Sequence, residues 1–122
     1  MAAQSLYNIE SLISENEFSY KAKIIINPYD PVFKGHFPGQ PVLPGVFTLD
    51  MFKECVSTVL KLDLRFSEIK QCKFTGMVDP FVCNILTLFF TLKKLESGFY
   101  IEAHAENGER IVLKMSALMV EN

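Results

Sequence analysis

Residues 46–61 contain neither Pro nor Gly and predict one helix that is apolar over most of its circumference. Among otherwise mainly apolar residues, four polar ones recur at steps of three and four and form one narrow stripe: Asp50, Glu54, Ser57 and Lys61. The remaining surface of such a helix is too apolar to stay in contact with water. The rest of the chain must therefore wrap around this helix.

The segments around the helix supply this cover as strands. Residues 18–27 begin with alternating apolar and polar side chains, which is typical of a half-buried strand. Further strands are predicted over residues 68–74, 82–95, 99–106 and 110–120. Asn107-Gly108 between the last two is a strong hairpin signal, whereas residues 7–13 fit a short helix or a strand. The sequence thus predicts an α+β fold in which an antiparallel sheet wraps one long central helix.

A proline-rich loop leads into the helix. Five of the six prolines fall between residues 28 and 44, which predicts a long, stiff segment without regular structure. Such a loop would hold His36 in a defined place at low entropic cost. Gly45 lies at or near the start of the helix, where free N–H groups and the helix dipole favour a developing negative charge. Asp50 follows just over one turn later, on the polar stripe.

Length and composition limit the classes of function. The 122 residues suffice for one domain spanning 1–122. A net charge of −2 gives no positive field for nucleic acid. The apolar run 81–92 is too short for a membrane span, which needs about 20 residues. Because the first residues also lack a signal-peptide pattern, we expect a cytoplasmic protein. With no Cys/His cluster and no phosphate-binding loop, we expect neither a metal nor an organic cofactor.

The sequence from 35 to 46 reads Gly-His-Phe-Pro-Gly-Gln-Pro-Val-Leu-Pro-Gly-Val, and Asp50 follows four residues later. This segment resembles the active-site signature of the 3-hydroxyacyl-acyl carrier protein dehydratases, which carry a carboxylate fourteen residues after the histidine. The match is dense over residues 31–50 and extends plausibly over most of 18–120. The resemblance implies a hot-dog fold, so we expect a single hot-dog domain over 1–122.

The resemblance also implies roles for individual residues. His36 would remove the proton at C2, and Asp50 would protonate the departing 3-hydroxyl. The backbone N–H of Gly45, with Val46 as its neighbour, would polarise the thioester carbonyl. In the family the histidine and the acid meet across a subunit boundary. The resemblance therefore implies a dimer or a trimer of dimers with sites at the dimer interface. Its substrate would be an acyl carrier protein bearing a 3-hydroxyacyl chain.

Two positions depart from the family pattern. Glu54 stands one turn after Asp50, where the family typically has a glutamine. Two carboxylates at this spacing resist joint ionisation, so Glu54 would either help Asp50 to keep its proton or misorient it. Aspartate at position 50 resembles the dehydratase branch that also isomerises the product double bond. The Pro38 version of the loop resembles the branch that only dehydrates, so both activities stay open.

Two other functions also fit the sequence. The first is a non-catalytic hot-dog subunit that binds acyl carriers or pairs with an active homologue, and Glu54 is its main support. The second is a hot-dog thioesterase, although the loop signature is not typical of such enzymes. For the site residues themselves, the alternatives are a loop histidine that bonds a carbonyl and a solvated helix stripe that contains Asp50.

Overall fold

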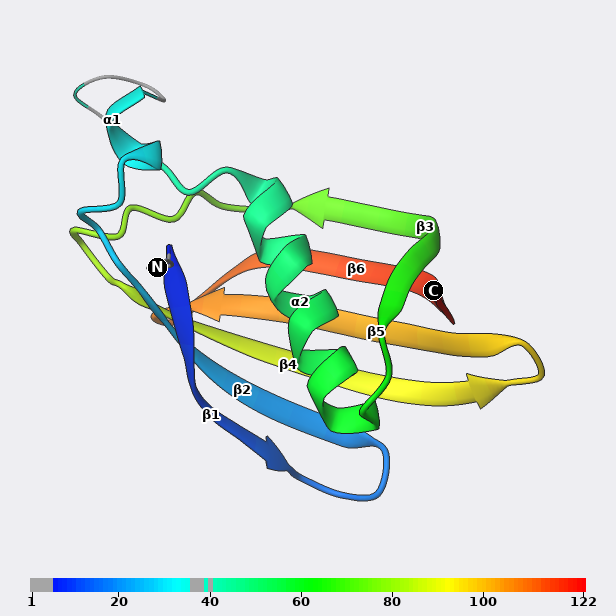
Figure 1. The fold of residues 1–122 in the computed structure, drawn as a ribbon. Helices are drawn as coiled ribbons and strands as arrows, with labels where there is room; N and C mark the ends of the chain where they lie inside the picture. Colours follow the sequence, from blue (N-terminus) through cyan, green and yellow to red (C-terminus); the bar gives the residue numbers. More distant parts are fainter. Residues whose placement is uncertain (1–5, 36–38, 40) are drawn as a thin grey trace.

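The computed structural model describes residues 6–35, 39 and 41–122. Six strands in this part of the chain form one sheet in the order β1-β2-β4-β5-β6-β3, with antiparallel neighbours throughout. The strands are β1 (Tyr7–Ser14), β2 (Ser19–Ile26), β3 (Leu64–Phe74), β4 (Ile85–Leu95), β5 (Gly98–Asn107) and β6 (Arg110–Glu121). The helices are α1 (Val32–Gly35) and α2 (Gly45–Leu60). Figure 1 shows α2 lying across one face of the curved sheet, which confirms the predicted sheet around a central helix.

Helix α2 has the predicted amphipathic pattern and begins and ends one residue earlier than expected. Its buried residues are Thr48, Met51, Phe52, Cys55 and Val56. Its exposed residues recur every four positions: Val46, Asp50, Glu54 and Thr58. Lys61 stops the helix, because its backbone is left-handed with φ of 57° and its N–H bonds to the Ser57 carbonyl. No helix of the described chain, α2 included, is long and apolar enough to cross a membrane.

The inner face of the sheet packs against α2. Buried residues recur mostly at every second position of β2, β4, β5 and β6: Ala22, Ile24, Ile26, Leu86, Leu88, Phe90, Leu92, Ile101, Ala105, Leu113, Met115, Ala117 and Met119. Phe52 of α2 meets Phe90 edge to face with ring centroids 6.3 Å apart, and Phe90 stacks on Tyr20 at 5.3 Å. These rings tie the helix to the sheet and fix which side of α2 faces outward.

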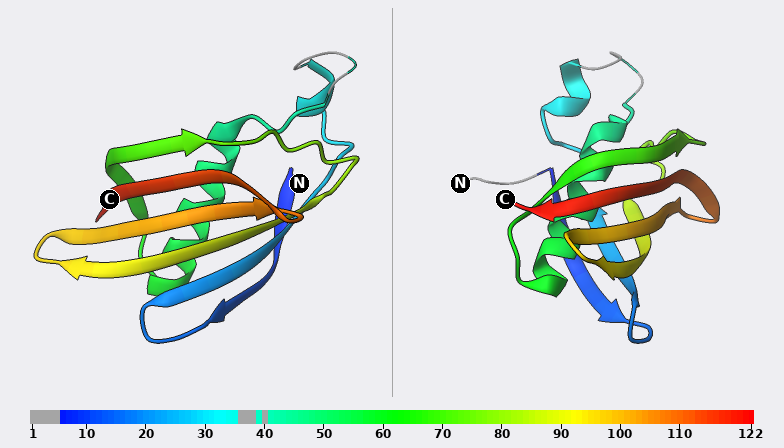
Figure 2. Two further views of the ribbon diagram at one scale, coloured as in Figure 1. Left: turned by 180° about the vertical axis from the view of Figure 1, so that it is seen from behind. Right: turned by 90° about the vertical axis from the view of Figure 1, so that its right-hand side faces the viewer.

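The opposite face of the sheet carries aromatic and polar side chains. Figure 2 shows this face from behind, and no helix of the described chain covers it. His104 of β5 stacks on Phe89 with ring centroids 4.7 Å apart, and its Nε2 lies 3.2 Å from the Glu106 carboxylate. The neighbouring Ala105 is buried on the helix side, so His104 points away from Asp50. His104 is therefore no candidate partner for Asp50 within one chain.

The prediction that residues 28–44 lack regular structure is wrong at α1. The Asp30 carboxylate accepts a hydrogen bond from the Val32 N–H at 2.9 Å, and the Asp30 carbonyl accepts one from the Phe33 N–H at 3.1 Å. Pro31 is compatible with this turn, because a proline at the start of a helix has no N–H to satisfy. Burial of the Phe33 ring then holds the short helix against the core.

Two predicted strand boundaries are also wrong. Strand β3 begins at Leu64 instead of residue 68, because register shifts between Phe66 and Glu68 and between Ile69 and Gln71 interrupt its alternation. Strand β4 begins at Ile85 instead of residue 82, since the Asp79 carbonyl accepts hydrogen bonds from the N–H groups at 82 and 83 and closes a turn there. Residues 7–13, left open by the sequence, lie in β1, which pairs with β2.

The predicted Asn-Gly hairpin between β5 and β6 is confirmed, but the asparagine has an additional role. Asn107 pairs with Arg110, so the loop is Gly108-Glu109, and Gly108 has the positive φ of 67° that this turn needs. The Asn107 side chain is buried and its Nδ2 donates to the carbonyls of Cys83 and Ile85 at 3.1 and 2.9 Å. This side chain anchors the hairpin to the start of β4.

Replacing Asn107 with alanine is expected to lower the free energy of unfolding by about 1–3 kcal/mol. The change removes two hydrogen bonds from a buried side chain to backbone carbonyls at the start of β4, and each such bond contributes about 0.5–1.5 kcal/mol. Urea denaturation of the two proteins measures the difference. Asn8→Ala in β1 is the matched control, because Asn8 is exposed. An equal decrease in the free energy of unfolding in the two variants would contradict the anchoring role of Asn107.

Candidate active site

Helix α2 begins at a point where the backbone is closely approached by an aromatic ring. Pro44 is extended, with φ of −63° and ψ of 135°, and Gly45 starts the helix. A Cβ atom on Gly45 would overlap the ring of Phe74, which lies at the end of β3. Glycine is therefore required unless the ring moves. The first N–H groups of the helix lack intrahelical acceptors and carry the positive end of the helix dipole.

An apolar pocket of about 260 Å³ adjoins this helix start. Its walls come from the segment before α2, the end of β3, residues 76–78 and β6, and include Val42, Val46, Phe74, Met77, Val78 and Leu113. Several of these side chains are exposed: Val46 by 59%, Phe74 by 54% and Met77 by 71%. The pocket thus combines an apolar lining with the positive end of α2, which suits an acyl chain and a carbonyl oxygen.

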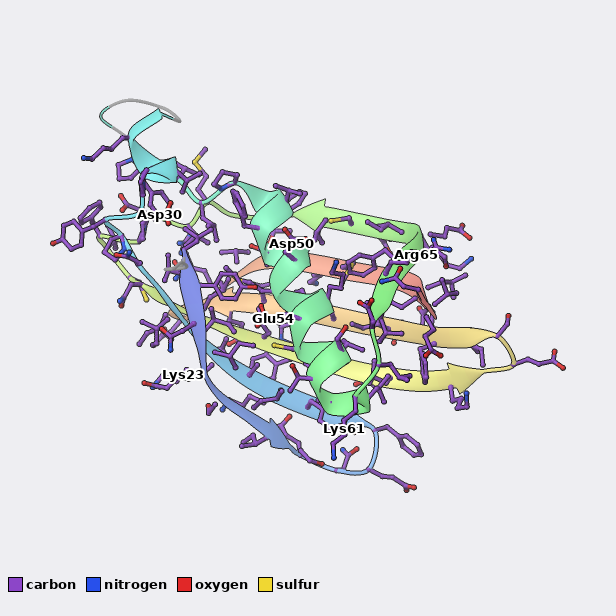
Figure 3. All side chains as sticks on the ribbon, in the orientation of Figure 1. Lys23, Asp30, Asp50, Glu54, Lys61 and Arg65 are labelled. Carbon is purple, nitrogen blue, oxygen red and sulfur yellow. The ribbon has the colours of Figure 1, made fainter. Side chains whose placement is uncertain are left out.

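Two carboxylates follow the pocket residue Val46 on the outward face of α2. Asp50 follows Val46 by one turn and Glu54 follows Asp50 by another, and both side chains are exposed. Figure 3 shows Asp50 and Glu54 one above the other on the side of the helix that faces away from the sheet. Residues four apart on a helix are surface neighbours, so the two carboxylates lie on adjacent turns of the same face. Asp50 therefore lies between the helix start and Glu54.

The structure brings together four of the five residues singled out in the sequence. Gly45 and Val46 line the pocket at the start of α2, and Asp50 and Glu54 continue the same exposed line. His36 lies outside the described residues, so its place relative to Asp50 stays a prediction. Gly35 at the end of α1 is its neighbour in the described chain.

One residue of this region was missed by the sequence reasoning. Tyr7, the first residue of β1, donates a hydrogen bond from its hydroxyl to Oε1 of Glu54. Burial raises the pKa of Tyr7, and the hydrogen bond and charge of Glu54, followed by Asp50 and Cys55, raise it further. The contact joins residues 47 positions apart and arises only when β1 folds beside α2, so no local sequence pattern signals it.

Comparison with known proteins identifies the family. The family model ApeI-like, described as ApeI dehydratase, matches residues 12–111. The chain belongs to this dehydratase family. Its dehydratase relatives include the 3-hydroxyacyl-acyl-carrier-protein dehydratase FabZ of Oenococcus oeni, which is 34% identical over 101 residues, covering 77% of this chain and 69% of that protein. The corresponding FabZ of Levilactobacillus brevis is 31% identical over 87 residues, covering 65% of this chain and 57% of the relative.

The matched region is thus a little more than half the length of the Levilactobacillus brevis relative. Among solved structures, the dehydratase heterocomplex ApeI:P from Xenorhabdus doucetiae resembles this ApeI-like chain with a TM-score of 0.78 and 21% identity. The superposition covers 93% of this chain and 97% of that one. At this level of identity the likeness establishes the hot-dog fold, which agrees with the sheet order and the central α2.

Proposed function

We propose that this ApeI-like protein removes water from 3-hydroxyacyl thioesters, carried on an acyl carrier protein, to give trans-2-enoyl thioesters. The observation that carries the proposal is the exposed Asp50 one turn after Val46, which lines an apolar pocket at the start of α2. Membership of a dehydratase family supports the same reaction. We further propose a cytoplasmic location.

Each site residue has one task in the proposed reaction. His36 accepts the proton from C2, and the electron pair of that C–H bond forms the new double bond as the C3–O bond breaks. Asp50 donates a proton to the leaving hydroxyl, so that water departs. The N–H groups of Gly45 and Val46 stabilise the negative charge on the thioester oxygen at the positive end of α2. Protons and electrons balance without another reactant.

The proposed assembly is a homodimer, alone or within a trimer of dimers, with two equivalent sites at its interface. The exposed apolar side chains beside the pocket support an interface there, because Val46, Phe74 and Met77 would otherwise face water. An isologous contact would place His36 of each copy near Asp50 of the other copy, which gives two equivalent sites. That one domain spans residues 1–122 remains part of this proposal, since residues 1–5 lie outside the described chain.

The decisive experiment incubates the purified chain with acyl carrier proteins that bear 3-hydroxyacyl groups of several lengths. Mass spectrometry of the intact carrier is expected to show loss of the mass of one water molecule. An enoyl carrier should show the reverse change, because the reaction is reversible. Release of free carrier thiol would favour a thioesterase instead. Carrier binding without any change of mass would overturn the enzyme proposal in favour of a non-catalytic subunit.

A further inference from the structure

A second pocket, of about 340 Å³, lies beside α1, and in the described chain it shares no lining residue with the pocket at the start of α2. Its walls include residues of the segment after β2, of α1 and of the turn before β4, and Figure 1 shows the first and the last of these side by side below α1. Tyr29 and Phe81 are exposed by 77% and 55%, and their rings meet edge to face with centroids 5.4 Å apart. Two large rings left open to water at a pocket indicate a binding site.

Each of these two rings lies on a turn that a polar side chain two residues earlier closes. The Asn27 side-chain oxygen accepts a hydrogen bond from the Tyr29 N–H at 3.0 Å, and the Asp79 carboxylate accepts one from the Phe81 N–H at 2.9 Å. Hydrogen bonds of this kind define Asx turns, which hold the backbone in one conformation. The backbone at both rings is therefore fixed before a ligand binds, which lowers the entropic cost of binding.

This aromatic pocket adjoins the segment that leads from α1 to α2. Lys34 and Gly39 both line it, and they stand on either side of His36 in the sequence. Pro41 lines it too, whereas Leu43, two residues further on, lines the pocket at the start of α2. The two pockets therefore flank one short stretch of chain, the stretch that precedes the helix start.

We propose that the aromatic pocket receives the pantetheine arm through which the carrier protein holds its acyl group, and that Tyr29 and Phe81 contact this arm. The inference rests on the proposed dehydratase function. The acyl tail can be buried, but the arm has to lead outward to the carrier, and the two exposed rings suit that outward path. Asp30 and Lys34 contribute one charge of each sign to the lining, which matches an arm that is uncharged between its thioester and its phosphate. The apolar pocket at the start of α2 then remains for the acyl tail.

The test uses two thioesters of one 3-hydroxyacyl group, with pantetheine or with N-acetylcysteamine, which keeps only the end of the arm next to the sulfur. Tyr29→Ala and Phe81→Ala are each expected to raise KM for the pantetheine thioester roughly fivefold, as for a lost aromatic contact. Since the contact is made equally before and during the reaction, kcat should stay nearly constant. For the N-acetylcysteamine thioester, KM should change by less than about twofold, because the missing part of the arm cannot reach the rings.

Phe18→Ala is the matched control, because Phe18 has the same exposed fraction as Phe81, 55%, but lies beside the start of β2 outside the pocket. It should leave KM unchanged for both thioesters. An equal rise in KM for both thioesters in the pocket variants would overturn the inference. A second series keeps the pantetheine arm and lengthens the acyl chain. If the rise in KM grows with acyl length, the pocket holds the tail and the inference is wrong.

A binding measurement without an acyl group separates this inference from the proposed function. In saturation-transfer NMR, the protons of free pantetheine should receive magnetisation from wild type and from Phe18→Ala, and much less from Tyr29→Ala or Phe81→Ala. Absence of transfer from wild type, or equal transfer from all four proteins, would overturn the inference even in an active enzyme. If transfer depends on the two rings but no thioester is turned over, the proposed dehydratase is wrong and the pocket still binds the arm.

Discussion

Asp50→Asn is expected to lower kcat for dehydration by roughly 10²–10⁴-fold, the usual contribution of a positioned proton donor. The amide has nearly the shape of the carboxyl group but cannot deliver a proton to the leaving hydroxyl. Because Asp50 is exposed on α2, the thermal midpoint should barely change. The measurement is the rate of enoyl carrier formation at substrate saturation. Asp63→Asn, at an exposed position beyond the end of α2, is the control and should keep full activity.

A mixing experiment extends this prediction to the proposed dimer. His36→Ala and Asp50→Asn should each be nearly inactive, since each lacks one member of both sites. When the two are unfolded together and refolded, about half of the dimers are hybrids, and each hybrid has one intact site. The mixture is therefore expected to regain roughly a quarter of the wild-type rate. Absence of any recovery in a refolded dimer would contradict a site shared between subunits.

Phe52→Ala is expected to reduce the free energy of unfolding by about 3–5 kcal/mol, because it empties a fully buried site between α2 and the sheet. The ring of Phe52 meets Phe90 edge to face, so its loss removes an aromatic contact as well as buried area. Urea denaturation measures the change. If the alanine variant does not fold, Phe52→Leu should lower the free energy of unfolding by less, so that its urea denaturation can still be measured.

The control for this prediction is Phe18→Ala. Phe18 is 55% exposed, so its truncation should change the free energy of unfolding by no more than about 0.5 kcal/mol, as for most surface substitutions. A similar loss from Phe18→Ala and Phe52→Ala would show that the aromatic stack does not hold α2 in place. A loss of several kcal/mol from Phe52→Ala alone would support the packing described for the central helix.

Much of the fold was predictable because its main elements have strong periodicity. Helix α2 has one narrow polar stripe, and β5 and β6 alternate around an Asn-Gly turn. The prediction was wrong where local interactions interrupt the pattern. Bulges conceal the start of β3, the Asp79 turn replaces the expected start of β4, and the Asp30 side chain starts α1 inside a proline-rich loop.

The candidate site was predictable to the extent that it lies in one continuous motif. Gly45, Val46 and Asp50 follow from the loop-to-helix pattern and lie together at the start of α2. Tyr7 was not predictable, because its contact with Glu54 depends on the pairing of β1 with β2. The role of His36 stays a prediction, since it lies outside the described residues.

The position of Tyr7 on β1 has a consequence for how the protein responds to heat. β1 is the first strand of the sheet order and pairs with β2 alone, so it can open while the other five strands stay paired. Such local unfolding has a lower free energy than global unfolding. Opening of β1 would remove the donor from Glu54 while Asp50 stays in place on the helix. The contact between Tyr7 and Glu54 beside the candidate site thus depends on a single edge strand, and hydrogen exchange in β1 measures how often that contact is broken.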